Sequence, residues 1–310
     1  MKQLLTKWIL WGLTVLFPFA MYAQDDTKHK VGIALSGGGA LGYAHLGVLQ
    51  ALEDYGIEPT IVSGTSMGAI VGVLYAAGLS PDEILVHIKT HKMNHNRKIM
   101  SLDIKSGELG LHSKKYIASF LQKVLPTDSF DSLPKPFYCA TTNLMTTKGE
   151  IIHSGDRLQK YTLASMSIPV LFQSVVIDSM VYIDGGLTNN LPACAIRNEC
   201  DILIGVDVNP YTEIKQIKNI KEAVMRTMST LVMHTSQEGR ACCDYIIDVY
   251  ASKDYSILDF SKYQEIYKIG YETGLHFLLN NPELLRATGE FKDKQPYKQN
   301  NTPTRNKKKK

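Results

Sequence analysis

The sequence predicts an α/β fold of three layers, with a mainly parallel central sheet between two layers of helices. Short apolar runs alternate along the chain with longer segments in which apolar residues recur every three or four positions, and this alternation is typical of parallel strands joined by covering helices. No linker-like segment interrupts residues 31–280, so we expect one domain. The chain has 310 residues, of which 44% are hydrophobic and 21% charged, a composition that excludes collagen, a coiled coil and a wholly disordered protein.

The first half of the chain supplies two strands, each followed by glycine residues and a helix. Residues 31–35 are a short apolar run that predicts a buried strand, and the helix after it is expected to stop at Gly56. Residues 60–63 predict the second strand, followed by a turn and an Ala-, Gly- and Val-rich helix that ends at Gly78. A further helix is expected to begin at residues 80–83, because Ser-Pro-Asp-Glu is a capping box with proline at the first helical position.

The second half of the chain carries the remaining strands and two long helices. Residues 90–112 are polar and irregular, and Ser113 is expected to cap a helix that runs through Leu125. Two long helical patterns cover about 217–240 and 261–279. The remaining apolar runs predict strands at residues 136–142, 151–153, 174–177, 181–183, 202–208 and 245–249.

The net charge of +4 is unevenly distributed. Residues 292–310 hold eight Lys or Arg residues and one Asp, a charge of +7, and residues 1–23 add +2. Removing both from the total of +4 leaves −5 for residues 24–291, so a basic body that binds nucleic acid is disfavoured. We expect residues 291–310 to be a solvated, disordered tail. The alternative is peripheral contact of this basic tail with anionic lipid headgroups.

The N-terminal segment has the layout of a secretory signal peptide of the bacterial Sec type. Lys2 and Lys7 precede an apolar run at residues 8–21, and Ala23 stands before a polar segment. This layout implies export to the periplasm or beyond, with the mature domain at residues 24–290. An uncleaved N-terminal anchor is the alternative.

The five cysteines are odd in number, and their spacing matches no zinc-binding pattern. An exported chain can oxidise one or two pairs. Cys194 and Cys200 are a candidate pair because they are close in sequence, but the connectivity stays open at this stage. We expect most of the cysteines, which also include Cys139, Cys242 and Cys243, to be small buried apolar residues.

A G-x-S-x-G segment lies between the second strand and the helix that follows it. It reads Gly64-Thr65-Ser66-Met67-Gly68, and the small residues around the serine permit a sharp turn that exposes its hydroxyl at the carboxyl end of the sheet. Ser66 would also lie at a helix N-terminus, where the helix dipole stabilises negative charge. We therefore predict that Ser66 is a nucleophile rather than part of a purely structural turn.

A second glycine cluster follows the first strand. Gly37, Gly38 and Gly39 allow consecutive backbone N–H groups to turn toward one point, as a serine hydrolase requires for the oxyanion of its tetrahedral intermediate. Together with Gly42 they also fit the dinucleotide-binding pattern G-x-G-x-x-G. That alternative requires an acidic residue at the end of the second strand, and residues 61–64 contain none. A cofactor is therefore not expected.

None of the nine histidines lies in a persuasive motif for the base that a nucleophilic serine needs. His45 is interpreted as packed or exposed on the first helix. His87, His91 and His95 recur every four residues, as metal ligands on one helix face would. No carboxylate-bearing motif accompanies them, so we expect a solvated helix face and no metal site.

Asp184 is the better candidate for the base. It ends a predicted strand, and Gly185 and Gly186 after it leave its carboxylate room to approach another loop. An Asp before two glycines is also an ordinary turn, so the motif gains weight only beside Ser66 and the glycine cluster. A carboxylate is a weak base at its usual pKa, and burial would strengthen it.

Three blocks in this order resemble the patatin-like phospholipase family: the glycine cluster of residues 37–42, the G-x-S-x-G segment and the Asp-Gly-Gly motif. Residues 164–169 (Ala-Ser-Met-Ser-Ile-Pro) and 184–192 resemble the family too, and the similarity spans about residues 31–210. The resemblance implies a patatin-like α/β fold.

The resemblance also implies a lipid acyl hydrolase, of phospholipase A or lysophospholipase type, that acts on phospholipids or other lipid esters without histidine, metal or cofactor. Ser66 would attack the ester carbonyl, Asp184 would serve as general base, and the first glycine cluster would form the oxyanion hole. The sequence departs from the family at Leu41, where arginine is often found. A lipid-binding or scaffold protein with a dormant site is the alternative from another class.

The polar segment at residues 90–112 is a candidate flexible cover over the acyl site. Met93, Ile99, Met100 and Leu102 would supply its apolar contacts. A simple surface loop is the alternative.

Overall fold

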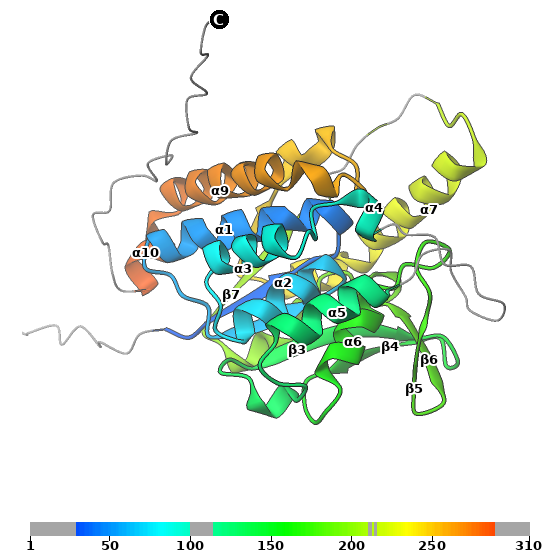
Figure 1. Cartoon of the computed structure of the whole chain (residues 1–310). Coiled ribbons are helices and arrows are strands. Elements are labelled where there is room, and N and C mark those ends of the chain that lie inside the picture. The colour runs from blue at the N-terminus through cyan, green and yellow to red at the C-terminus, as the bar shows by residue number, and fades with distance from the viewer. Residues whose placement is uncertain (1–28, 100–113, 210–212, 214–215, 289–310) are drawn as a thin grey trace, which may run out of the picture.

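The computed structural model describes residues 29–99, 114–209, 213 and 216–288 (Figure 1). The predicted signal peptide (residues 1–23), the basic tail (residues 291–310), Met100, Leu102 and Ser113 lie outside the described residues. Among the helices that are described, no single one is both long and apolar enough to cross a membrane. Only the pair Met67–Ala76 and Pro81–Thr90, bent by 118° between its members, reaches that length and composition.

A mixed sheet of eight strands forms the centre of the described chain. Its strands are β1 (Val31–Leu35), β2 (Ile61–Gly64), β3 (Phe137–Asn143), β4 (Lys148–Ile152), β5 (Val175–Ile177), β6 (Met180–Asp184), β7 (Ile202–Asp207) and β8 (Tyr245–Asp248). Strands β3, β2, β1, β7 and β8 are adjacent in that order and parallel, as predicted. Strands β4 and β6 are antiparallel to β3, and β5 is antiparallel to β6. Each strand overlaps the apolar run that predicted it.

Helices cover both faces of the sheet, which confirms the predicted three-layer α/β arrangement. One face carries α1 (Tyr43–Asp54), α2 (Met67–Ala76), α3 (Pro81–Thr90), α4 (Asn96–Ile99), α5 (Lys115–Val124), α6 (Leu158–Ser165), α9 (Tyr263–Asn280) and α10 (Pro282–Thr288), and their buried side chains form one core (Figure 1). The other face carries the 3-10 helix η4 (Ala193–Glu199) and α8 (Gln237–Cys242). Helix α7 (Ile220–Thr235) extends away from the body of the molecule (Figure 1).

Strand β1 contributes to the cores on both faces. Ile33 and Leu35 belong to the larger core with α1 and α9, whereas Ala34 belongs to a smaller cluster with Ile196 of η4. Because successive side chains of a strand point to opposite faces, a strand buried on both sides reads as the continuous apolar run seen in the sequence.

Several helices follow the sequence signals, but α6 and α10 were not predicted, and α4 lies in a segment that was expected to be irregular. The capping box before α3 is present, with the Ser80 N–H donating to Glu83 Oε2 at 2.9 Å and the Glu83 N–H donating to Ser80 Oγ at 3.3 Å. The pattern at about 217–240 forms two helices rather than one, because α7 ends before Ser236 and α8 begins after it. At this break Asn190 Nδ2 donates a hydrogen bond to Ser236 Oγ at 3.0 Å. Helix α5 has Lys114 at its N-cap.

Strand β3 is longer than β2, and this difference decides where the site forms. Gly64, the last residue of β2, is paired with Cys139, so residues 140–143 of β3 continue beyond β2. The antiparallel strand β6 pairs with this extension and places Asp184 opposite Thr141. Strand β6 therefore runs back toward β2, and its last residue, Asp184, lies beside the turn that follows β2.

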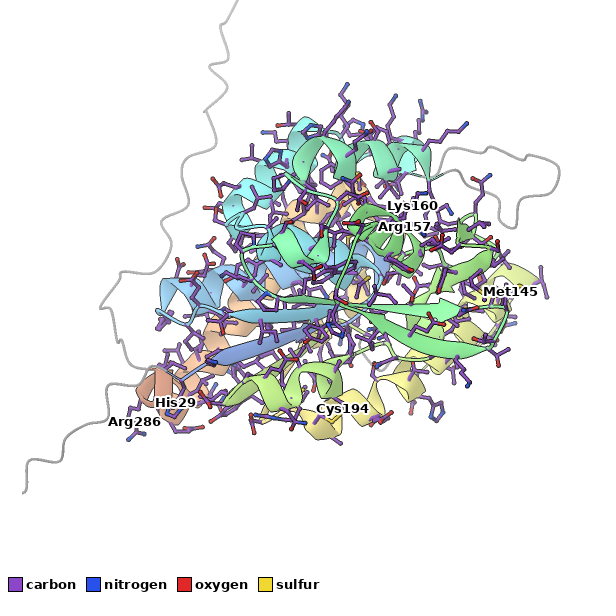
Figure 2. All side chains as sticks on the ribbon, turned by 90° about the horizontal axis from the view of Figure 1, so that it is seen from below. His29, Met145, Arg157, Lys160, Cys194 and Arg286 are labelled. Atoms are coloured by element: carbon purple, nitrogen blue, oxygen red, sulfur yellow. A yellow bond between two sulfur atoms is a disulfide. The ribbon has the colours of Figure 1, made fainter. Side chains whose placement is uncertain are left out.

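The disulfide joins Cys194 to Cys242 and not to Cys200, so the candidate pair named from the sequence is wrong. Cys194 lies on η4 and Cys242 at the end of α8, and these two elements are neighbours on the same face of the sheet (Figure 2). Cys200 comes after η4 and lies against the backbone of Gly32 in β1, where its thiol donates to the carbonyl of Ile196 at 3.4 Å. Cys200, although close to Cys194 in sequence, thus lies against the sheet. The partner of Cys194 is Cys242, 48 residues away on α8.

Candidate active site

Ser66 occupies a sharp turn between β2 and α2. Its backbone has φ +56° and ψ −122°, a conformation that costs an L-residue of the order of 1–3 kcal/mol. The flanking glycines allow this turn, because a Cβ on Gly64 would lie 2.4 Å from the carbonyl oxygen of Gly68, and one on Gly68 would lie 2.4 Å from that of Leu35. The Ser66 N–H donates to Ser165 Oγ at 2.9 Å. The turn predicted from G-x-S-x-G is therefore present.

The hydroxyl of Ser66 donates a hydrogen bond to the carboxylate of Asp184. The distance from Ser66 Oγ to Asp184 Oδ2 is 2.7 Å, and Asp184 Oδ1 accepts the N–H of Gly186 at 2.7 Å. Ser66 is 5% exposed and Asp184 is 4% exposed. The two side chains come from positions 118 residues apart and are held in one orientation before any ligand arrives.

Burial raises the pKa of Asp184 from its ordinary value of 3.8 to about 7, although the hydrogen bonds from Gly186 and Ser66 act in the opposite direction. Desolvation disfavours the charged carboxylate, and this is the larger effect. The group therefore changes its charge near neutral pH and is a much stronger base than an exposed aspartate.

Ser66 and Asp184 line a cavity of about 550 Å³, solvent at its mouth included. The glycine loop of residues 37–39 and Asn190 line it too. The rest of the wall is mostly apolar and comes from Ile168, Leu187, Ile257 and, on α7, Met225, Met228, Leu231 and Val232. A cavity with a few hydrogen-bonding groups and a mostly apolar wall suits a ligand that has one polar group and an apolar chain.

Two residues of the glycine loop that line the cavity, Gly38 and Gly39, differ from Gly37 in the hydrogen bonding of their backbone N–H groups. The Gly37 N–H donates to the carbonyl of Asn190 at 3.2 Å. Within the described residues, the N–H groups of Gly38 and Gly39 have no hydrogen-bond acceptor. Gly38 and Gly39 line the same cavity as Ser66, so these two adjacent free donors are suited to a ligand oxygen there.

Other backbone groups of the loop have hydrogen-bond partners. The Leu41 N–H donates to the Gly38 carbonyl at 3.1 Å, and the Ala40 N–H donates to the Ile257 carbonyl at 2.8 Å. Gly39 has φ +56°, and a Cβ there would lie 2.3 Å from the Ile257 carbonyl oxygen, so only glycine fits. The loop is therefore fixed at residues 38–41 by backbone hydrogen bonds and by close packing against Ile257.

The expected cover over the site is not provided by the described part of residues 90–112. Met93 and Ile99 are 2% and 1% exposed and pack in the larger core, and the Tyr43 hydroxyl donates to the Met93 carbonyl at 2.8 Å. They are buried because the segment folds onto α1 and α5 instead of remaining irregular. Much of the apolar wall of the cavity comes instead from α7. The sequence predicted this segment as a helix but gave no indication that it lines the site.

No histidine among the described residues forms a hydrogen bond with Ser66 or Asp184. His45 is fully buried, its Nε2 contacts the Ser36 carbonyl at 2.8 Å, and burial lowers its pKa to about 4. His87 and His91 stack on each other with ring centroids 5.6 Å apart. Across the part of the chain that is described, no three His, Cys, Asp or Glu side chains form a group that could hold a metal ion.

The sequence profile described as patatin-like phospholipase matches residues 33–195, more than half of the chain. The chain belongs to this family. The glycine loop, the Ser66 turn and the Asp184 turn are the three segments of this chain whose sequences resemble the patatin-like family. Leu41, which stands where the family often has arginine, is buried in the larger core.

Several fungal lysophospholipases are similar to this patatin-like chain. Lysophospholipase NTE1 of Kluyveromyces lactis is 28% identical over 291 residues, which cover 84% of this chain and 20% of that protein. Lysophospholipase NTE1 of Saccharomyces cerevisiae is also 28% identical and covers 84% of this chain and 17% of its own length. The chain thus spans about a fifth of the length of the curated relatives it matches.

Solved structures with a similar chain path are more distant. VipD from Legionella pneumophila has a TM-score of 0.44 and 15% identity, covering 82% of this chain and 67% of that one. Human GIVD cytosolic phospholipase A2, in complex with methyl gamma-linolenyl fluorophosphonate, has a TM-score of 0.43 and 11% identity, covering 86% and 60%.

The raised pKa of Asp184 predicts how stability depends on pH. The folded protein keeps the proton of Asp184 up to about pH 7, whereas the unfolded chain loses it near 3.8. Between these values the unfolded chain binds fewer protons, so the free energy of unfolding falls as pH rises, by up to about 4 kcal/mol for a shift of this size.

Asp184→Asn removes this loss of stability. We expect the variant to gain stability relative to the natural chain as pH rises from 4 to 7, and the gain to level off above about 7. Urea unfolding of both proteins at pH 5, 6, 7 and 8 measures the difference, in which the contributions of other groups cancel. Parallel pH curves for the two proteins would show that Asp184 does not hold its proton to neutral pH.

Proposed function

We propose that this protein is a lipid acyl hydrolase that cleaves carboxylic esters of phospholipids or lysophospholipids through Ser66 and Asp184. The hydrogen bond of 2.7 Å between Ser66 Oγ and the buried Asp184 carboxylate carries the proposal. Membership of the patatin-like phospholipase family and similarity to fungal proteins named lysophospholipases support it. The apolar wall of the cavity supports an acyl chain as the part of the substrate that lies there.

The first half of the reaction forms an acyl-serine. Asp184 Oδ2 takes the proton of Ser66 Oγ while this oxygen attacks the ester carbonyl carbon. The carbonyl oxygen gains negative charge and accepts hydrogen bonds from the free N–H groups of Gly38 and Gly39, with further stabilisation from the N-terminus of α2. The tetrahedral intermediate then collapses, the C–O bond to the alcohol breaks, and Asp184 returns the proton to the leaving oxygen.

The second half releases the fatty acid. Asp184 takes a proton from a water molecule, whose oxygen attacks the acyl carbonyl, and the same N–H groups stabilise the second intermediate. Collapse of this intermediate breaks the bond to Ser66 Oγ, which recovers its proton from Asp184. The raised pKa of Asp184 suits both steps, because the carboxylate must accept and return a proton near neutral pH.

Fluorophosphonate labelling and ester hydrolysis test the dyad. We expect one adduct, on Ser66, and hydrolysis that rises with pH to a plateau above about pH 7, because the ionised form of Asp184 is the base. Ser66→Ala should abolish both signals, and Asp184→Asn should lower kcat by roughly a thousandfold or more.

Ser229 provides an internal control because its side chain lines the same cavity. Peptide mass spectrometry of the labelled protein distinguishes the two serines. An adduct on Ser229 would contradict the assignment of the nucleophile. No adduct and no ester hydrolysis by the folded protein would instead favour a lipid-binding protein with a dormant site.

Helix α7 should set the preference for acyl chain length. Met228→Asn places a polar amide on the apolar wall, where each buried methylene of a ligand contributes about 0.8 kcal/mol. We expect kcat/KM to fall at least about tenfold for long-chain esters and to change little for acetyl esters. Met233→Asn is the matched control, since Met233 lies on the same helix and does not line the cavity. If Met228→Asn lowered kcat/KM equally for long-chain and acetyl esters, α7 would not be part of the acyl site.

We propose that the protein is exported. The signal-peptide layout of residues 1–23 supports this, as does the Cys194–Cys242 disulfide, because disulfides persist mainly in oxidising compartments. Non-reducing peptide mapping of the protein isolated from its own cells should recover Cys194 linked to Cys242, with Cys139, Cys200 and Cys243 as thiols. Five free thiols in that material would argue against export.

A further inference from the structure

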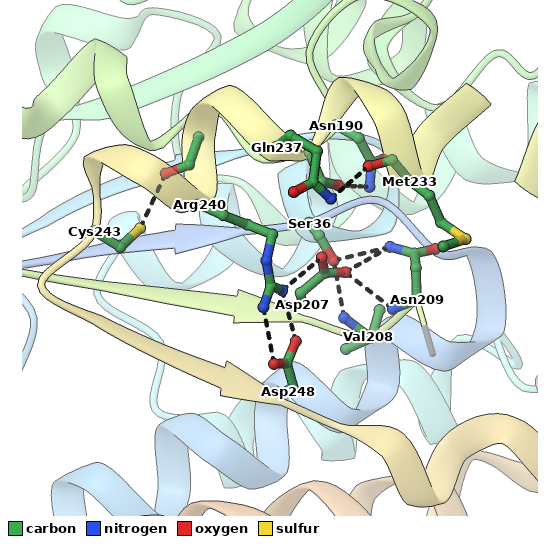
Figure 3. A network of polar contacts seen from close by, with 12 residues as sticks. Ser36, Asn190, Asp207, Val208, Asn209, Met233, Gln237, Arg240, Cys243 and Asp248 are labelled. Carbon is green, nitrogen blue, oxygen red and sulfur yellow. Dashed lines mark hydrogen bonds and ion pairs between the residues drawn. The ribbon is translucent and has the colours of Figure 1, made fainter. Parts of the chain in front are cut away.

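A network of polar contacts joins Ser36, Asp207, Asn209, Arg240 and Asp248 (Figure 3). Two of its side chains reach the glycine loop, that of Ser36, which precedes Gly37, and that of Asn209, which follows β7. Asn209 Nδ2 donates to the Gly37 carbonyl at 2.7 Å, and the Ser36 hydroxyl donates to the same carbonyl at 3.1 Å. Asn209 is therefore the side chain with the shorter contact to the loop.

The geometry of the peptide bond links this contact to the proposed oxyanion hole. The Gly37 carbonyl and the Gly38 N–H belong to one peptide unit, and no described peptide bond is cis. In a planar trans peptide the C=O and N–H bonds point in opposite directions. Holding the carbonyl from behind therefore keeps the Gly38 N–H directed away from Asn209, toward the side where Gly38 lines the cavity.

Asn209 is itself held in place by a buried carboxylate. Asp207 Oδ1 accepts both the side-chain and the backbone N–H of Asn209, each at 3.0 Å. Because Asp207 Oδ1 and the Gly37 carbonyl are both acceptors, the amide nitrogen of Asn209 must face them, which fixes the orientation of the side chain. The Asp207 side chain is only 7% exposed.

A charged pair completes the network (Figure 3). Arg240 Nη1, from α8, donates to Asp207 Oδ2 at 3.2 Å. The same guanidinium binds Asp248 at the end of β8 through two hydrogen bonds of 2.6 and 2.9 Å. Bidentate contacts of this kind fix geometry as well as charge. The ends of two strands and one helix therefore converge on Asn209.

We propose that Asn209 is a positioning residue for catalysis: it holds the Gly37–Gly38 peptide so that the Gly38 N–H meets the oxyanion. This inference deepens the proposed function and rests on it. The peptide needs such a restraint because glycine on both sides of it permits rotation that other residues would resist. Without Asn209, only the longer contact from Ser36 holds the Gly37 carbonyl.

Asn209→Leu tests the proposal, because leucine has a similar size and no donor. With p-nitrophenyl butyrate as substrate, we expect kcat to fall about tenfold or more while KM stays within about twofold. This loss is smaller than the roughly 100- to 1000-fold that follows removal of an oxyanion donor itself. The affinity for a trifluoromethyl ketone, which forms an oxyanion on Ser66, should fall by the same factor as kcat/KM.

Asn281→Leu is the matched control. Asn281 Nδ2 also donates to a backbone carbonyl at 2.7 Å, that of Phe277, but at the end of α9 and outside the site. We expect this variant to keep the kcat, the KM and the inhibitor affinity of the natural chain. Asn209→Ser is a second test variant, because serine is too short to reach the Gly37 carbonyl and disturbs the packing less.

Hydrogen–deuterium exchange of the peptide spanning residues 36–42 gives a readout that does not require activity. We expect faster exchange there in both Asn209 variants, because the Gly37 N–H is bonded to Asn190 only while the loop is held. Unchanged exchange, unchanged kcat or a rise in KM alone would overturn the positioning role. If the natural chain neither hydrolyses esters nor reacts with fluorophosphonate, the proposed function fails, and the exchange rates still decide whether Asn209 holds the loop.

Discussion

The site depends on one buried hydrogen bond, between the Ser66 hydroxyl and the Asp184 carboxylate. Neither partner is useful alone: an exposed aspartate is too weak a base, and a buried serine without a base has no acceptor for its proton. Burial solves the first problem because it raises the pKa of Asp184 to about 7. The strands that carry the two residues therefore have to meet inside the protein and away from water.

Strand order provides that meeting. A parallel sheet alone would bring together the carboxyl ends of strands that run in one direction, and Ser66 follows such a strand. Asp184 ends β6, which runs in the opposite direction and reaches the same place because β3 extends past β2. The reversal in the chain before β6 is therefore a requirement of the site, and the Gly186 N–H then orients the carboxylate.

The sequence was sufficient to predict the eight strands, the three-layer arrangement and the turn at Ser66, because apolar runs and glycine spacing are local signals. It did not reveal that β6 is antiparallel to β3, since the direction of a strand depends on partners far away in the chain. Cys194 was associated with Cys200 by proximity in sequence, whereas its partner is decided by the packing of α8 on η4. The same limitation applies to Met93 and Ile99, whose burial the sequence did not show, and to Met225 and Met228 of α7, whose place in the cavity wall it did not show. Asn209 carried no signal, because its role depends on which carbonyl it reaches.

Helix α7 has one face on the cavity and has no fully buried residue among those described. Under the proposed function, an acyl chain in the cavity would add apolar contacts to this face of the helix. By thermodynamic linkage the effect is mutual. The free energy by which the ordered helix favours binding of the chain equals the free energy by which the bound chain favours ordering of the helix. Under the proposed function, substrate and helix would form one cooperative unit that separates when the product leaves.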